Sequence, residues 1–396
     1  MSRTAAKTQD RLVPKDRPVA SRLAALEGLR GLAALAVVVH HLLLTWSDPL
    51  RGAMRDLFYY TPVEFIFSGG KSVRLFFVLS GFVLYIWSTK AKRESLSLFT
   101  LRRVVRLWPP FIAAALLAFA VLLVPPSAST AGLSPWFQNV AQASDATFSV
   151  FLQHLFLFGT GAGISPNVPT WSLVIEARMM VLFPVLLWGL RRHDAATIVV
   201  VVLASLMGDQ ALAAAGENRD HVSAETWIGA VALTLHYLPG FAFGMVLAKR
   251  QNEVAAILSR VSPTVTIVLW MLAYLFMRRS FEVVTFTGCA MVLALAANTT
   301  WSVRALTTPA MQWLGKYSYP LYLIHLPVII LCVRLLHEVL PMPVVLVVAG
   351  AVSLTAAQML DTVSAAPAHS VARALLQWKR WGAARGEAER MAAMAQ

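Results

Sequence analysis

The sequence predicts an all-α polytopic membrane protein with about ten transmembrane helices. Hydrophobic residues make up 58% of the 396 positions and charged residues only 14%, and the mean hydropathy is +0.64. That composition is too apolar for a soluble domain of this length. Apolar runs of about 17–25 residues, the length that crosses a bilayer, recur along the whole chain.

Ten apolar windows are predicted to span the bilayer. In chain order they are 29–46, 72–88, 107–124, 171–190, 195–214, 227–248, 264–278, 281–299, 313–336 and 341–361. The window 264–278 is the weakest, because Arg278 and Arg279 crowd its end. A further apolar run, Thr147 to Phe158, is only about twelve residues long and is expected to be re-entrant or interfacial.

The positions of Lys and Arg predict that the N-terminus and the C-terminus are both cytoplasmic. With that orientation most cations fall in cytoplasmic segments, and the long stretch 107–190 contains a single cation, Arg178. The net charge of +14 is then mostly topological, so no nucleic-acid partner is expected.

Three parts of the chain follow from this topology. They are a basic cytoplasmic tail at 1–28, a transmembrane domain at 29–361 and a basic cytoplasmic tail at 362–396. The first residues are polar and basic, so no cleavable signal peptide is expected. The tail after Ala365 is rich in Ala and Arg, which is typical of an interfacial helix.

Arg30 and His41 stand eleven residues apart in the first apolar run. At about 100° per residue this spacing puts both side chains on one helix face, roughly 16 Å apart along the axis. An ionisable ring inside a bilayer costs several kcal/mol unless it is partnered, so a functional role is the default. The alternative is a histidine that only hydrogen-bonds a neighbouring helix.

Counting residues from the predicted membrane surfaces places four polar side chains in one layer. His41, Ser80, Glu176 and His325 come from separate windows, yet each is expected between mid-depth and the outer face. Each residue alone could be a hydrogen bonder in a helix core. Together they predict an intramembrane site.

Arg103 and Arg106 precede the third window on its predicted cytoplasmic side. Their i, i+3 spacing puts them on one helix face, and the planar guanidinium of Arg suits bidentate phosphate contacts. For an isolated pair, topology and lipid headgroup binding explain the same pattern.

Five ordered sequence blocks resemble the acyltransferase-3 family, the integral membrane O-acyltransferases. Arg30 and His41 form an Arg-x10-His pattern, and Leu75–Phe82 resembles the family's FFxxSGF block. The other blocks are RxxR at Arg103 to Arg106, WSLxxE at Trp171 to Glu176, and a Tyr-rich block from Gly315 to His325. Together they cover nine of the ten predicted windows.

The resemblance implies transfer of an acyl group from cytoplasmic acyl-CoA, most often acetyl-CoA, to a hydroxyl of an extracytoplasmic carbohydrate-containing acceptor. It implies a multi-pass protein of the inner membrane, with no bound cofactor and no metal. His41 is then the catalytic residue. The residues expected to bind the CoA phosphates or the thioester arm are Arg30, Arg102, Arg103 and Arg106.

The implied chemistry needs a base, because a hydroxyl must lose its proton as it attacks the thioester carbonyl. Neutral His41 can accept that proton, and Glu176 can orient His41 or act as the base itself. A covalent acyl-His41 intermediate is an open alternative to direct transfer. The residues expected to support the acceptor or the oxyanion are Ser80, Trp171, Ser172, Tyr317, Tyr319 and His325.

The chain departs from the family pattern at two places. Arg74 stands where many members have an acidic residue, so it is expected either to favour an acidic acceptor or to pair with Glu64 or Glu176. Ala177 follows the WSLxxE glutamate where many members have a second acid, which argues against a paired-carboxylate mechanism. Arg178 inside a window needs a partner.

Two other classes of function fit parts of the pattern. A proton-coupled secondary transporter would use the intramembrane His, Glu and Arg residues as a relay, with no consumption of CoA. A catalytically silent scaffold of the same fold would not need His41. If the chain is an enzyme, it either completes the transfer in the membrane or hands the acyl group to a separate periplasmic transferase.

Overall fold

The computed structural model describes residues 17–47, 61, 63–90, 96–141, 151–152, 167–216 and 226–364. The regular structure in these residues is helical, and one isolated antiparallel bridge joins Trp46 to Leu133. The predicted all-α polytopic membrane fold is therefore confirmed. Of the predicted re-entrant run, only two residues, 151–152, are described, and both are helical. Of the predicted C-terminal tail, residues 362–364 belong to the last helix and the rest lies outside the described residues.

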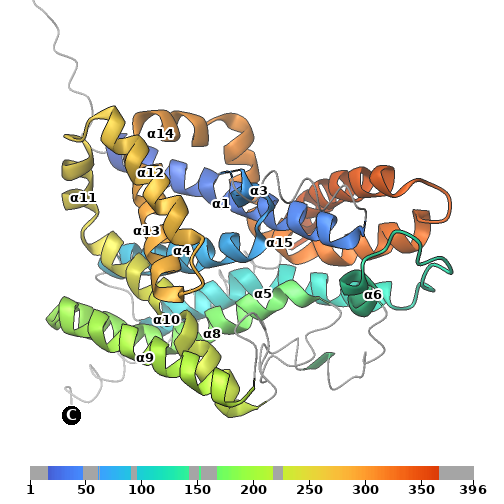
Figure 1. Cartoon of the computed structure of the whole chain (residues 1–396), viewed down its shortest axis with the longest axis horizontal. Helices are drawn as coiled ribbons and strands as arrows, with labels where there is room; N and C mark the ends of the chain where they lie inside the picture. The colour runs from blue at the N-terminus through green and yellow to red at the C-terminus, as the bar shows by residue number, and fades with distance from the viewer. Residues whose placement is uncertain are drawn as a thin grey trace, which may run out of the picture.

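Figure 1 shows the helices in chain order by colour. They are α1 (Arg17–Thr45), α3 (Glu64–Phe67), α4 (Gly69–Lys90), α5 (Leu96–Val121), α6 (Pro135–Ala141), the 3-10 turn η1 (Val168–Thr170), α8 (Trp171–Arg192), α9 (Asp194–Ala214), α10 (Trp227–Lys249), α11 (Gln251–Leu258), α12 (Pro263–Met277), α13 (Glu282–Asn298), α14 (Thr300–Leu306), α15 (Pro309–Leu336) and a last helix, Met342–Ser364.

Each of the ten predicted windows overlaps a helix, but only eight of these helices are long and apolar enough to cross a membrane by themselves. The helix α12 has 15 residues, which is about 22 Å, shorter than a hydrocarbon core of about 30 Å. The helix α13 has 17 residues and meets α14 at a bend of 86°. The first helix also begins at Arg17, so residues 17–28 of the predicted tail are helical.

Parallel packing of α1 against α15 sets the position of the residues singled out above. Gly31 lies against Gly315, where a Cβ on Gly31 would come within 2.4 Å of the Gly315 nitrogen. Ten residues further along each helix, from 31 to 41 and from 315 to 325, His41 contacts His325. Two contacts at equal spacing show that the helices run side by side in the same direction.

The helices α4 and α10 also approach at backbone distance, but in opposite directions. A Cβ on Gly81 would lie 2.1 Å from the carbonyl oxygen of Phe241, and one on Gly244 would lie 2.0 Å from that of Val78. Small residues of this kind let membrane helices pack closely.

The helix α9 lies at the edge of the bundle (Figure 1) and exposes a row of apolar side chains, including Val200 and Met207. That face suits contact with lipid. The opposite face of α9 carries the buried Asp209 toward α10.

Candidate active site

One face of α1 presents both Arg30 and His41 to α15, as their spacing predicts. The Arg30 side chain donates from Nε to Ser318 Oγ at 2.9 Å and from Nη2 to the Gly315 carbonyl at 3.0 Å. His41 Nδ1 lies 3.2 Å from His325 Nε2. The two positions are about 16 Å apart along the helix.

The imidazole of His41 is half-buried among aromatic and histidine rings. Its ring centroid lies 5.0 Å from that of His325 and 5.5 Å from that of Trp136 in α6. Among the described residues, nothing hydrogen-bonds Nε2 of His41, whereas Nδ1 contacts the Val37 carbonyl oxygen at 3.0 Å. His40 turns elsewhere and donates from Nδ1 to Phe67 O at 2.9 Å. His41 is thus the histidine that faces α15, as the spacing favours.

Glu176 belongs to a different contact set from His41. Its carboxylate accepts a hydrogen bond from Ser80 Oγ at 3.1 Å and forms an ion pair with Arg103. The expectation that Glu176 orients His41 is therefore wrong in this structure, because His325 and the Val37 carbonyl occupy Nδ1 of His41.

The ion pair between Arg103 and Glu176 also corrects the predicted depths. Counting residues put Arg103 at the cytoplasmic face and Glu176 near the outer face, yet the two side chains are in contact. Such counting assumes that each helix starts at a membrane surface and runs straight across, and α5 begins at Leu96, well before the predicted window.

The arginines form a positively charged group around this pair. Arg30 lies close enough to Arg103, Arg106 and Glu176 for direct electrostatic interaction. Arg106 is exposed, while the Nε of Arg103 is buried and has no hydrogen-bond partner in the described part of the chain. The side chain of Arg102 lies outside the described residues. The structure thus brings Arg30 together with the RxxR pair.

The remaining predicted site residues are mostly engaged in holding helices together. Tyr322 Oη donates to the Pro169 carbonyl at 2.7 Å, and Ser172 Oγ lies 2.7 Å from the same hydroxyl. Tyr319 donates to the Leu107 carbonyl at 2.9 Å. Because these hydroxyl groups already form hydrogen bonds between elements, Ser172 and Tyr319 hold η1, α5 and α15 in position in this structure.

Trp171 and Tyr317 differ from each other in surroundings. Trp171 packs in an aromatic cluster, with its ring centroid 5.3 Å from Tyr237 and 6.0 Å from Phe77. Tyr317 contacts Lys316 and Trp313 on the outside of α15, away from the histidine pair.

Trp136 is a residue of the candidate site that the sequence did not single out, because it lies in a short segment with no motif.

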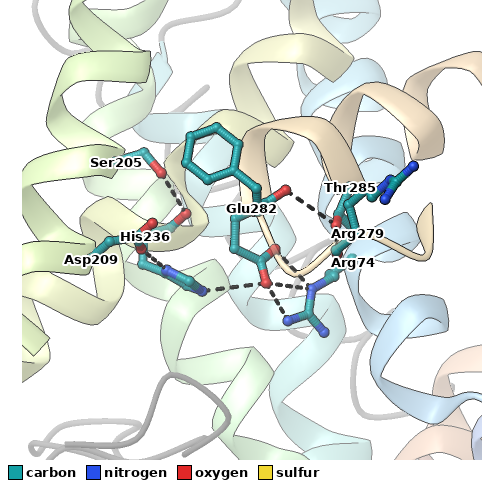
Figure 2. Close-up of polar contacts among 8 residues, drawn as sticks. Arg74, Ser205, Asp209, His236, Arg279, Glu282 and Thr285 are labelled. Carbon is teal, nitrogen blue, oxygen red and sulfur yellow. Dashed lines mark hydrogen bonds and ion pairs between the residues drawn. The ribbon is translucent and has the colours of Figure 1, made fainter. Parts of the chain in front are cut away.

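A second polar cluster joins four helices, and Figure 2 shows its members in line. The Arg74 Nε of α4 lies 2.9 and 2.8 Å from the two carboxylate oxygens of Glu282 in α13. His236 of α10 has Nε2 3.5 Å from Glu282 and Nδ1 paired with Asp209 of α9. All four side chains are buried or nearly so. The expected pairing of Arg74 with Glu64 or Glu176 is wrong, because Glu282 neutralises it.

The charge of Arg178 is satisfied by backbone and hydroxyl groups. Its Nη1 donates to the Ala230 carbonyl at 2.9 Å and to Thr234 Oγ1 at 3.2 Å. Both acceptors lie on α10, so Arg178 ties α8 to that helix.

In the described part of the chain, no three His, Cys, Asp or Glu side chains are grouped to hold a metal ion.

Comparison with known proteins agrees with the sequence blocks. An acyltransferase from Streptomyces mycarofaciens, MdmB, is 26% identical over 79% of this chain and 80% of its own length. A putative peptidoglycan O-acetyltransferase from Bacillus subtilis (strain 168), YrhL, is 24% identical over 77% of this chain, which spans about half (48%) of that relative. No solved structure matches. The family model described as an acyltransferase domain matches residues 23–361, so the chain belongs to the acyltransferase-3 family of multi-pass membrane acyltransferases.

Proposed function

We propose that this protein is an acyl-CoA-dependent O-acyltransferase of the inner membrane, with His41 as its catalytic residue. The observation that carries the proposal is the layout of α1. One helix face holds Arg30 within a group of cations and, about 16 Å further on, His41 with its Nε2 unengaged by the described residues. An anionic donor with a long reactive arm needs such a layout.

The cations of Arg30, Arg103 and Arg106 suit the phosphate groups of a CoA donor. Three guanidinium groups lie near two carboxylates, Glu176 and Glu27, which pairs with Arg30 at 3.4 Å, so one net positive charge remains. Arg binds phosphate through charge-assisted bonds. The pantetheine arm of the donor then extends along α1 and presents the thioester carbonyl to His41. We take acetyl-CoA as the first donor to test.

The acyl transfer accounts for every bond and proton with only two reactants, the acyl-CoA donor and the acceptor hydroxyl. Nε2 of His41 takes the proton from the acceptor hydroxyl as its oxygen bonds to the thioester carbonyl carbon. The tetrahedral intermediate collapses, the carbon–sulfur bond breaks, and the imidazolium of His41 returns the proton to the leaving thiolate. The products are the O-acyl ester and free CoA. A covalent acyl-His41 step would give the same products in two stages.

Arg106 offers a clean test of donor binding, because it is exposed and forms no described ion pair. Arg106→Ala is expected to raise the KM for acetyl-CoA about ten- to a hundredfold, the effect of losing one charged hydrogen bond. The kcat should change little. CoA release over a range of acetyl-CoA concentrations measures both constants. The matched control is Arg260→Ala, another exposed arginine, remote in sequence from the five blocks, and an equal rise in both variants would contradict the assignment.

The acceptor is proposed to be a carbohydrate-containing molecule that reaches His41 past α6. This class is favoured by the name of the Bacillus subtilis relative and by the position of Trp136, whose half-buried indole lies against His41. The apolar face of a sugar ring packs well on an aromatic ring through dispersion.

Trp136→Ala is expected to raise the KM for a glycan acceptor about three- to tenfold, in proportion to the loss of one aromatic contact. The KM for acetyl-CoA should stay the same, because the arginines lie at the other end of the site. Acetylation of soluble peptidoglycan fragments measures the effect. Trp227→Ala, at an exposed tryptophan of α10, is the control. A change in the acetyl-CoA KM alone would place Trp136 on the donor path instead.

Release of CoA from acetyl-CoA by the detergent-purified protein, with peptidoglycan fragments as acceptor, tests the proposed function itself. Release by wild type that requires the acceptor supports an acyltransferase. Binding of neither donor nor acceptor, together with proton-driven solute uptake in vesicles, would favour a transporter.

A further inference from the structure

The histidine pair has a definite direction of hydrogen bonding. His325 is fully buried in α15, and its Nδ1 lies 3.1 Å from the Leu321 carbonyl oxygen. Its Nε2 lies 3.2 Å from Nδ1 of His41, which in turn lies 3.0 Å from the Val37 carbonyl oxygen. A carbonyl oxygen only accepts hydrogen bonds, so each contact with a carbonyl requires a hydrogen on the ring nitrogen.

These rules leave one neutral arrangement. The contact with Leu321 places the hydrogen of His325 on Nδ1, and its Nε2 is then an acceptor. The contact with Val37 places the hydrogen of His41 on Nδ1, which His41 shares between the carbonyl and the acceptor Nε2 of His325. The lone pair of His41 is therefore on Nε2.

The opposite direction fails on geometry. If His325 donated from Nε2 to His41, the Nδ1 lone pair of His41 would face the lone pairs of the Val37 carbonyl at 3.0 Å. A neutral His325 would also turn an Nδ1 lone pair toward Leu321 O at 3.1 Å. Buried polar contacts without a hydrogen between them are costly.

We infer that His325 is a positioning residue for catalysis: together with the Val37 carbonyl it holds His41 with the hydrogen on Nδ1 and its basic nitrogen, Nε2, toward the reactants. The inference rests on the proposed function and deepens it, because it assigns to a histidine the orienting role that a carboxylate such as Glu176 plays in other catalytic groups. His325 does not touch the reacting atoms in this scheme.

A histidine in this role has a consequence for the charge that develops in the reaction. When His41 takes a proton on Nε2, its Nδ1–H becomes a stronger donor, and the bond to the neutral His325 strengthens with it. No carboxylate has to be buried beside the ring. The parallel packing at Gly31 and Gly315 keeps the two rings at the same level, so the acceptor is in place before the proton moves.

The first test is spectroscopic and does not depend on activity. Histidine labelled with ¹⁵N gives distinct NMR signals for a ring nitrogen with and without hydrogen, and the His41 signals are those lost in His41→Asn. We expect hydrogen on Nδ1 and none on Nε2 in the wild-type protein at neutral pH. Hydrogen on Nε2 would overturn the inference, whatever the enzyme does.

The second test compares two replacements of His325. Gln can place an amide oxygen where Nε2 of His325 lies, whereas Leu keeps the volume and removes the acceptor. His325→Leu is expected to lower kcat about a hundredfold or more and to leave the KM for acetyl-CoA unchanged, because the His41 ring loses the acceptor that fixes its orientation and stabilises its imidazolium. His325→Gln should recover activity to within about tenfold of wild type.

The outcomes separate the two proposals. If His41→Ala is inactive while His325→Leu is as active as wild type, the positioning role is overturned and the proposed function stands. If His41→Ala is active, the proposed function itself fails. Equal losses in His325→Leu and His325→Gln, with both proteins folded by thermal unfolding in detergent, would show that His325 only packs.

Discussion

Replacing His41 with alanine should lower acyl transfer from acetyl-CoA by about 10³–10⁴-fold, the upper part of the usual range for a positioned general base. The loss should fall on kcat, because Arg30, in the proposed phosphate-binding group, is about 16 Å away along α1. The measurement is the initial rate of CoA release by purified protein with peptidoglycan fragments present. The KM for acetyl-CoA should remain near the wild-type value.

His193→Ala is the matched control for this experiment, since its side chain is exposed at the junction of α8 and α9. It should retain the wild-type rate. If His41→Ala kept more than a tenth of the activity, His41 would only hydrogen-bond its neighbours, and the base would have to be sought elsewhere.

Exchanging Glu282 for glutamine should lower the free energy of unfolding by about 3–5 kcal/mol, because it leaves the buried guanidinium of Arg74 without its carboxylate. His236 would lose one of its two acidic neighbours in the same step. Thermal unfolding in detergent, followed by near-ultraviolet circular dichroism, measures the change as a lower midpoint. The exposed pair Arg250 and Glu253 provides the control, and Glu253→Gln should leave the midpoint nearly unchanged, because solvent screens an exposed ion pair.

The double variant Arg74→Met/Glu282→Leu separates the charge effect from loss of packing. Apolar side chains of similar size should restore much of the stability, because neither charge is then left alone in the bundle. A double variant as unstable as the sum of its single variants would show that the two residues act independently, contrary to the ion pair.

The sequence predicted the helical membrane fold and the face that Arg30 and His41 share, because both depend on local periodicity. It did not predict the cluster of Arg74, Asp209, His236 and Glu282. These residues come from four separate apolar windows and share no local pattern, and their meeting depends on which helices are neighbours. That information lies in close approaches such as those of α4 and α10, which no local pattern reveals.

The same limit explains the corrected partners inside the candidate site. Counting residues from the predicted membrane surfaces places Glu176 at a depth near that of His41. That count does not give the depth of a residue when its helix extends beyond the membrane or crosses it at an angle. The pairing of Arg103 with Glu176 and of His41 with His325 follows from the packing of α5, α8 and α15. Trp136 was missed because a single tryptophan in a short connecting segment carries no periodic signal.

In the proposed reaction, an acyl group passes from acyl-CoA to a hydroxyl at a site built around His41. The most direct test gives the reconstituted protein acetyl-CoA labelled in the acetyl group, together with peptidoglycan fragments, and follows both free thiol and alkali-labile label on the glycan. We expect equal amounts of thiol and ester with wild type, and neither with His41→Ala. Labelled glycan formed equally by His41→Ala, or wild-type protein that does not bind acetyl-CoA, would contradict the proposed reaction.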